Sequence, residues 1–170
     1  IFANNITDRI KLESQLRSTA RKLQLALSVS NTVPWQWNLK TGVVTFEDMG
    51  ILGRTTSRQV TNAYGQDEWQ ITFSDLANRI HPDYRQHLNG LYDNFRSGRI
   101  TEDQMQMRMY RQLHSDETDW VQVYSAVTGR TDDGFPIVTG TLKVITEQKQ
   151  QEEDMAKAKE MAEESDRMKS

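Results

Sequence analysis

Cysteine is absent from the whole sequence. Its absence excludes disulfide bonds, cysteine metal ligands and thiolate nucleophiles, and it is consistent with a reducing compartment. Long apolar runs are absent as well, because no segment approaches the roughly 20 residues that cross a bilayer. No signal peptide opens the chain. We therefore expect this part of the protein to be cytoplasmic.

Basic charge and hydrophobic residues are also scarce. The 21 Lys and Arg are outnumbered by 24 Asp and Glu, so the chain lacks the basic surface that nucleic-acid binding needs. Hydrophobic residues make up 36 % of the chain, which is low for a fully packed domain and predicts long solvated helices. No phosphate-binding loop or phosphotransfer motif is present. We expect no catalytic activity from this chain.

The two ends suggest a longer parent protein. The chain starts at Ile1 rather than Met and stops at Ser170 inside a predicted helix. We expect further domains on both sides, and the parent protein can still carry a membrane span. Charge and periodicity divide the chain itself into residues 1–31, 32–146 and 147–170.

Residues 1–31 predict a helix with one apolar seam. Apolar and small side chains recur at alternating spacings of four and three, at Leu12, Leu16, Thr19, Leu23, Ala26 and Ser30. This heptad pattern predicts a helix that starts near Thr7 and stops at Asn31. Two interpretations remain open: a coiled coil with a second copy, or an amphipathic helix that lies on its own domain.

Residues 32–146 contain nearly all the aromatic side chains and predict the folded domain. Apolar and polar side chains alternate within residues 35–46, and Gly42 interrupts the alternation. This pattern predicts a hairpin with its turn at Gly42. Residues 47–72 contain Gly50, Gly53 and Gly65 and predict short helical turns and loop. A helix capped by Ser74 and Asp75 should reach Ile80, and a second should open at Pro82 and end at residues 97–98.

Three further strands are predicted after the helices. Met105, Met107 and Met109 share one face of the first, and the face of the second is shared by Val121, Val123, Ser125 and Val127. The third covers residues 135–145. The predicted elements follow one another along the chain as two strands, then helices, then three strands. This order predicts an α+β fold, with a five-stranded antiparallel sheet and helices on one face.

Residues 147–170 contain no aromatic residue, glycine or proline and predict a charged helix. Met161 and Met168 are seven residues apart, which makes only a weak seam. This helix either contributes to a dimer or is free in solvent.

Several segments resemble a PAS domain, a sensory module of bacterial signalling proteins. Residues 79–84 resemble the start of its central helix, residues 119–123 its fourth strand, and residues 140–149 its last strand and exit helix. The exit of the family usually has Asp where this chain has Val144. The sequence at residues 145–148 is similar to that at residues 6–9, and each segment leads into a long charged helix. The same type of junction therefore occurs at both ends of the domain. Residues 159–170 resemble the helix that precedes the phosphoacceptor helix of histidine kinases.

The resemblance implies a signal-sensing or signal-relay domain of a two-component sensor histidine kinase. Its partners would be a second copy, paired through the flanking helices, a downstream kinase core and a response regulator. Ile145, Thr146 and Glu147 would form the output junction. The phosphoacceptor histidine would lie beyond Ser170.

A ligand cavity is predicted between the sheet and the helices. Its candidate lining residues are Trp37, Phe46, Met107, Met109 and Val123, although the same residues could form a closed core. The ligand or cofactor is not identified. Flavin photosensors of this kind need a reactive cysteine, so a cysteine-adduct flavin is excluded. Haem ligated by His87 is the less favoured interpretation, because an exposed histidine needs no special role.

Two other functions compete with the sensor. One is a ligand-free dimerisation spacer, which transmits motion without sensing. The other is a small metal-dependent hydrolase built on Asp83, His87 and His114, which requires three convergent ligands around one metal ion.

Overall fold

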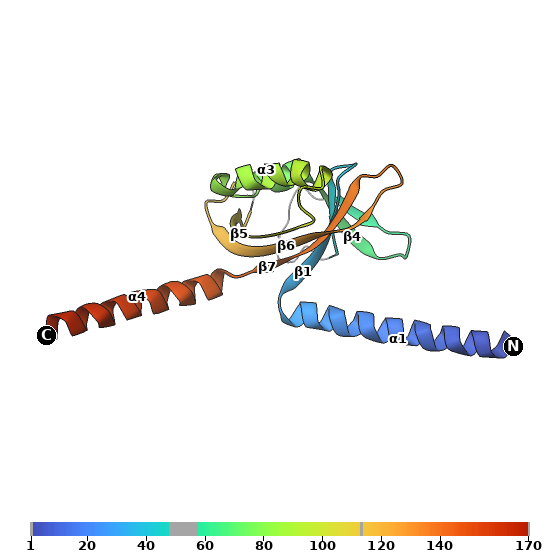
Figure 1. Cartoon of the computed structure of the whole chain (residues 1–170), viewed down its shortest axis with the longest axis horizontal. Helices are drawn as coiled ribbons and strands as arrows, with labels where there is room; N and C mark the ends of the chain where they lie inside the picture. Colours follow the sequence, from blue (N-terminus) through green and yellow to red (C-terminus); the bar gives the residue numbers. More distant parts are fainter. Residues whose placement is uncertain (1, 48–57, 113, 170) are drawn as a thin grey trace.

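The protein is described here by a computed structural model that covers residues 2–47, 58–112 and 114–169. Two long helices extend in opposite directions from a central unit of sheet and helices (Figure 1). The elements are α1 (Phe2–Val29), β1 (Thr32–Asn38), β2 (Val43–Phe46), β3 (Arg58–Thr61), β4 (Asp67–Thr72), α2 (Phe73–Asn78), α3 (Pro82–Arg96), β5 (Glu102–Tyr110), β6 (Thr118–Arg130), β7 (Pro136–Val144) and α4 (Thr146–Lys169).

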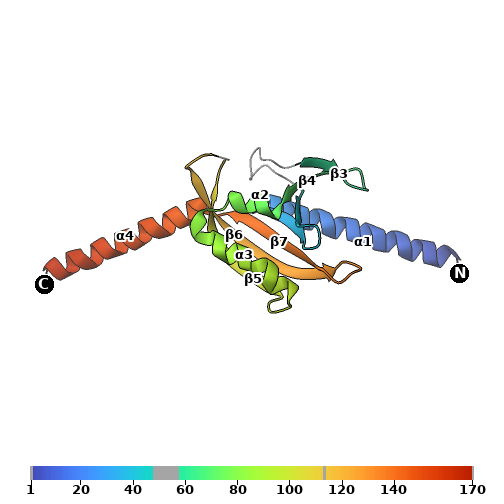
Figure 2. The same ribbon diagram turned by 90° about the horizontal axis from the view of Figure 1, so that it is seen from above.

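The strands form one antiparallel sheet in the order β3-β4-β2-β1-β7-β6-β5. Helix α3 crosses one face of this sheet, with α2 on the same side (Figures 1 and 2). The predicted α+β class, with helices on one face of an antiparallel sheet, is confirmed. The predicted number of strands is wrong, since the sheet has seven strands rather than five.

The two additional strands, β3 and β4, form a hairpin within the segment predicted as helical turns and loop. The side chain of Asn62 accepts hydrogen bonds from the backbone N–H groups of Tyr64 and Gln66, and Gly65 has a φ of +77°. Most side chains of β3 are exposed because it is an edge strand. An edge strand without a buried face has no clear alternation of apolar and polar residues, so its sequence did not predict a strand. Gly50 and Gly53 lie outside the described residues.

Helix α3 is the main cover of the sheet. It begins at Pro82, where the missing N–H costs no helical hydrogen bond, and it ends before Gly98, which has a φ of +73°. Leu88, Leu91 and Phe95 are its buried side chains, which confirms the predicted apolar face. Helix α2 begins earlier than predicted, because its cap is Thr72, whose hydroxyl accepts from the backbone N–H of Asp75 at 3.1 Å.

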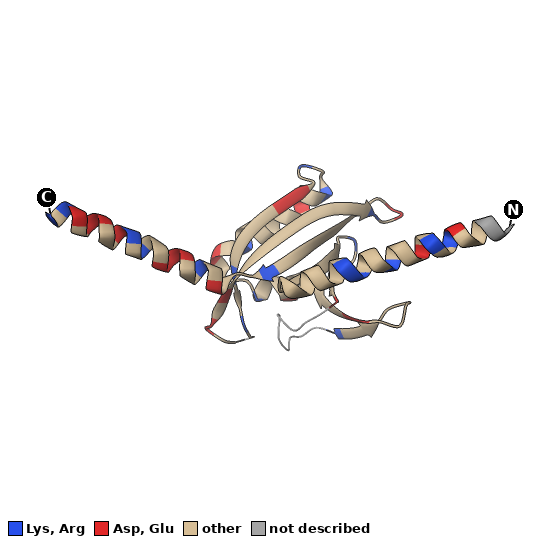
Figure 3. Ribbon diagram, turned by 90° about the horizontal axis from the view of Figure 1, so that it is seen from below, with Lys and Arg blue, Asp and Glu red and all other residues tan. Residues whose placement is uncertain are grey.

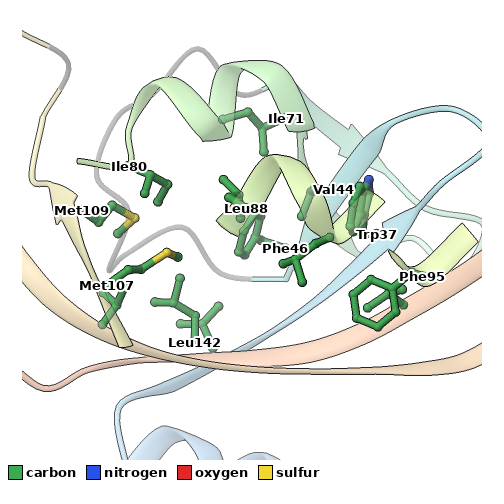
Figure 4. Packing of buried hydrophobic residues seen from close by; sticks show 14 of the residues in the cluster. Trp37, Val44, Phe46, Ile71, Ile80, Leu88, Phe95, Met107, Met109 and Leu142 are labelled. Carbon is green, nitrogen blue, oxygen red and sulfur yellow. The ribbon is translucent and has the colours of Figure 1, made fainter. Parts of the chain in front are cut away.

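The core lies between the sheet and the two covering helices (Figure 4). Trp37 of β1 is 2 % exposed. Its ring stacks on Phe73 of α2 with centroids 4.2 Å apart and lies edge-on to Phe95 at 6.5 Å. These contacts attach both helices to one central strand, since aromatic pairs add to the stabilisation from apolar burial.

The terminal helices are solvent-exposed along most of their length. In α1, Leu12, Leu16 and Leu23 are 57 to 62 % exposed, so this helix does not lie on its own domain. It starts at Phe2 rather than near Thr7 and stops before Asn31, which has a φ of +52°. Among the described residues, neither these nor the shorter helices are long and apolar enough to cross a membrane.

Candidate functional site

A cavity of about 50 Å³ lies between the sheet and helices α2 and α3. The described residues that line it are Trp35, Trp37, Val44, Phe46, Phe73, Leu76, Ile80, Leu88, Leu91, Phe95, Asp103, Met105, Met107, Met109, Val123, Ser125 and Leu142. The five predicted candidates, Trp37, Phe46, Met107, Met109 and Val123, all line this single space, and Figure 4 shows several of them between α3 and the sheet. That they bind a ligand stays a prediction.

The volume limits what the cavity holds in this form. It is smaller than the roughly 150 Å³ that accommodates benzene in an engineered protein, and far below the roughly 300–1,000 Å³ of ordinary ligand pockets. Met105, Met107 and Met109 form one wall, and flexible methionine side chains can repack around a larger guest.

Trp35 reaches the cavity because the neighbouring strand has no side chain at Gly140. Trp35 pairs with Gly140 in the register of β1 and β7. A Cβ atom at Gly140 would come closer than 3.0 Å to both the indole ring of Trp35 and the carbonyl oxygen of Tyr124. The glycine thus permits the close approach of a large ring. Both tryptophans of β1 thus face inward, toward the core.

Two polar side chains interrupt the apolar lining at its β5–β6 side. Ser125 donates from its hydroxyl to the backbone carbonyl of Asp103 at 3.3 Å. The carboxylate of Asp103 lies 3.1 Å from Nε2 of His87 on α3. The Asp103 side chain is 16 % exposed, whereas His87 is 51 % exposed. This pair links the outer side of α3 to edge strand β5, and His87 is not among the described residues that line the cavity.

The predicted output junction is attached to the sheet through a threonine. The hydroxyl of Thr146 donates to Oδ1 of Asp119 at 2.8 Å and accepts from the backbone N–H of Trp120 at 2.9 Å. The backbone N–H of Ile145 donates to the carbonyl of Trp120 at 2.8 Å. Ile145 is buried and Glu147 is exposed in the first turn of α4. Helix α4 therefore starts on β6 as well as on β7.

An arginine on the β5–β6 connection completes this junction. Arg111 donates from Nε and Nη2 to the two carboxylate oxygens of Asp119, each at 3.1 Å. Hydrogen bonding to Asp119 and its negative charge raise the pKa of Arg111 above the ordinary value. Val144 at the end of β7 has no polar side chain, and Asp119 supplies the carboxylate of this junction from the neighbouring strand β6. The side chain of Asp119 thus contacts both Arg111 and Thr146.

Two contacts connect this junction to the helices over the cavity. Nζ of Lys149 in α4 lies 5.1 Å from the ring centroid of Trp120, and that ring lies edge-on to Tyr84 of α3 at 6.0 Å. At the end of α2, Arg79 donates from Nη2 to the backbone carbonyls of Tyr110 and Arg111, at 2.8 and 2.7 Å. Burial lowers the pKa of Arg79. Both covering helices therefore contact the residues that surround the start of α4.

The three residues of the hydrolase interpretation do not form a site. His87 contacts Asp103, Asp83 lies 3.5 Å from His81, and His114 lies in the β5–β6 connection with a φ of +66°. Within the described ranges, no group of three His, Cys, Asp or Glu side chains could hold a metal ion. The requirement for convergent ligands is not met, and the interpretation as a metal-dependent hydrolase is wrong.

Several site residues were not predicted from the sequence. Asp103 and Ser125 line the cavity, and Arg111 and Asp119 hold the junction. A signal existed for the first pair, because each is a polar residue at an inward position of a strand whose other inward residues are apolar. No comparable signal marks Arg111, since its partner depends on how the hairpin closes.

Comparisons with known proteins were made for the whole chain. No family model matches it, and no curated protein matches it. Among solved structures it is similar to a sensory box histidine kinase/response regulator from Burkholderia thailandensis E264, with a TM-score of 0.58 and 21 % identity over 84 % of this chain and 98 % of that one. It is also similar to the N-terminal domain of a diguanylate cyclase with PAS/PAC sensor from Marinobacter aquaeolei, with a TM-score of 0.48 and 18 % identity over 69 % of this chain and 97 % of that one.

Proposed function

From the PAS fold of this chain, we propose that it is a signal-sensing or signal-relay domain of a cytoplasmic two-component sensor histidine kinase. It works as a dimer, and α4 carries the output to a kinase core that acts on a response regulator. The chain itself performs no catalysis. Residues 32–146 are the sensory domain, and residues 1–31 and 147–170 are its signalling helices.

One observation carries this proposal: a single strand joins the cavity to the output helix. Leu142 of β7 lines the cavity, and four residues later Thr146 begins α4 and bonds to β6. Expansion of the cavity around a guest would shift β7 relative to β6. Because Thr146 is bonded to β6 while its chain continues from β7, that shift changes the direction of α4. A ligand that prefers one arrangement then biases the output.

The small cavity favours a second candidate, the ligand-free dimerisation spacer. At about 50 Å³, the space could be a packing defect of a closed core, and motion would then arrive through α1 alone. In that case the domain relays a signal from upstream without binding anything.

Native mass spectrometry of the freshly purified chain, compared with its denatured mass, separates these candidates. A dimer that carries additional mass lost on denaturation supports the sensor. A dimer of twice the chain mass supports the relay. A monomer at micromolar concentration contradicts the proposal that the helices of this chain form the dimer.

The seam of α1 is the proposed contact between the two copies. Leu12, Leu16 and Leu23 are all more than half exposed, and exposed leucines at heptad spacing are buried by a partner helix. Helix α4 carries eight acidic and five basic side chains along its length and has only a weak methionine seam (Figure 3). We therefore assign most of the dimer affinity to α1.

Replacing Leu16 by glutamate is expected to raise the dimer dissociation constant at least tenfold, because it places two negative charges against each other in the seam. Sedimentation equilibrium at several concentrations measures this change. Leu25 is the matched control, since it is 59 % exposed but lies on another side of the helix. If Leu25→Glu weakens the dimer as much as Leu16→Glu, the seam is assigned to the wrong residues.

A further inference from the structure

We propose that the cavity selects a small aliphatic ammonium ion, whose apolar tail enters the cavity and whose charged head displaces His87 from Asp103. This inference rests on the proposed sensing function and specifies the class of ligand. It depends on three features of the described residues: the charge of the cavity lining, the position of the His87–Asp103 pair, and the size of the space.

The charge of the lining decides which ligands are excluded. Asp103 is the single ionisable side chain among the described residues that line the cavity, and all the others are apolar except Ser125. An anionic ligand would meet a negative group, and the described lining residues include no lysine or arginine to offset it. A purely apolar ligand would gain nothing from Asp103. A cation with an apolar tail satisfies both parts of the site.

The position of the pair makes the carboxylate available to a ligand. Asp103 is in the edge strand β5 and its side chain is mostly buried, at 16 % exposure, so an ion pair there is screened less than one on the open surface. His87 is half exposed, and its ring can turn into solvent without breaking core contacts. The histidine thus satisfies Asp103 when no ligand is present and is readily displaced.

The size and shape of the space favour an aliphatic tail. About 50 Å³ holds a short alkyl chain more readily than an aromatic ring. Met105 lies next to Asp103 on the inward face of β5 and can move to accommodate the first carbons. Trp35 also lines the cavity, and an indole ring attracts an ammonium group through its π face.

The test compares three probes of equal length: n-butylammonium, 1-butanol and butyrate. Each is titrated into the intact dimer-competent chain while the four tryptophan indole N–H resonances are followed by NMR. Trp35 and Trp37 line the cavity and should shift, whereas Trp69 and Trp120 do not line it and serve as internal controls. We expect n-butylammonium to bind at least tenfold more tightly than 1-butanol and butyrate to cause no saturable shift.

Three variants test the role assigned to Asp103. Asp103→Asn should reduce the affinity for n-butylammonium at least tenfold, to the level of 1-butanol. His87→Ala should increase it severalfold, because the competing partner is gone. Asp132→Asn, at an exposed turn and not among the described residues that line the cavity, removes the same charge and should leave the affinity unchanged. Unaltered Trp69 and Trp120 resonances in each variant show that the fold is intact.

The possible failures are distinguishable. If 1-butanol or butyrate binds as tightly as n-butylammonium, or if Asp103→Asn has no effect, the inferred charge selection is wrong while the cavity and the sensing function stand. If none of the probes shifts Trp35 or Trp37, both this inference and the ligand-sensing form of the proposed function are wrong, and the relay remains.

Discussion

Replacing Gly140 by alanine is expected to destabilise the fold by about 3 kcal/mol, the upper end of the cost of overpacking a core. Gly140 lies in β7 between β1 and β6, which are both central to the sheet. The new methyl group would approach the backbone carbonyl of Tyr124 and the ring of Trp35 to less than 3.0 Å. The backbone of β6 cannot move away without breaking its hydrogen bonds to β5 and β7. The side chain of Trp35 therefore has to move out of the cavity wall.

Urea denaturation followed by circular dichroism measures this loss as a lower midpoint at an unchanged slope. Gly129→Ala in β6 is the matched control, because a Cβ atom there meets nothing within 4 Å and its backbone does not need a glycine. The control is expected to change the free energy of unfolding by less than about 0.5 kcal/mol, as is usual for surface substitutions. Equal stability of the two variants would show that Trp35 does not pack against Gly140 as described.

Replacing Thr146 by valine is expected to destabilise the protein by about 2 kcal/mol and to loosen the first turn of α4. Valine keeps the shape of threonine but removes the hydroxyl that donates to Asp119 and accepts from the N–H of Trp120. That N–H group, in a partly buried part of β6, is left without its partner, and the acceptor Asp119 keeps only Arg111. The junction then holds α4 through β7, the backbone bond of Ile145 and the contact of Lys149 with the ring of Trp120.

Hydrogen exchange locates the effect. The amide of Lys149 donates to the carbonyl of Ile145 in the first turn of α4 at 2.9 Å, and its exchange is expected to accelerate at least tenfold. Thr146→Ser retains the hydroxyl and should restore most of the protection. Thr45→Val is the control, since Thr45 lies in β2 and makes no side-chain hydrogen bond among the described residues. An unaltered Lys149 amide in Thr146→Val would remove Thr146 from the output junction.

The consequence of this second variant for signalling follows from the position of the junction. If the hydroxyl contacts between α4 and β6 are lost, a change in the cavity no longer alters the direction of α4. Butylammonium added to Thr146→Val should then still shift the resonances of Trp35 and Trp37 but leave the exchange of Lys149 unchanged. In the unmodified chain both observables should respond together.

Much of the fold could be predicted from residue patterns. The inward face of β5, with three methionines in alternation, and the buried face of α3, with Leu88, Leu91 and Phe95, agree with the structure. These patterns are reliable because each element buries one face against a single core. The hairpin of β3 and β4 was not predicted, because an exposed edge strand is held by backbone pairing and by the turn at Asn62, neither of which needs alternating apolar residues.

The cavity could be predicted only in part. Trp37, Phe46, Met107, Met109 and Val123 were identified because large apolar residues at inward positions must lie near the space between sheet and helices. The volume of that space depends on how closely the side chains interdigitate, which no single-residue pattern contains. The sequence patterns therefore did not indicate that the space is only about 50 Å³ in this structure.

The α+β class, the inward faces of the strands and the two solvated helices at the ends follow from residue patterns, because side-chain periodicity and charge depend only on neighbours along the chain. The contacts between distant residues depend on the folded arrangement: His87 with Asp103, Thr146 with Asp119, and Trp35 with Gly140. Each of these pairs comes from two different elements, and their contact depends on strand register and on the placement of α3. Local pattern specifies which way a residue faces, while the packing of elements specifies what it meets.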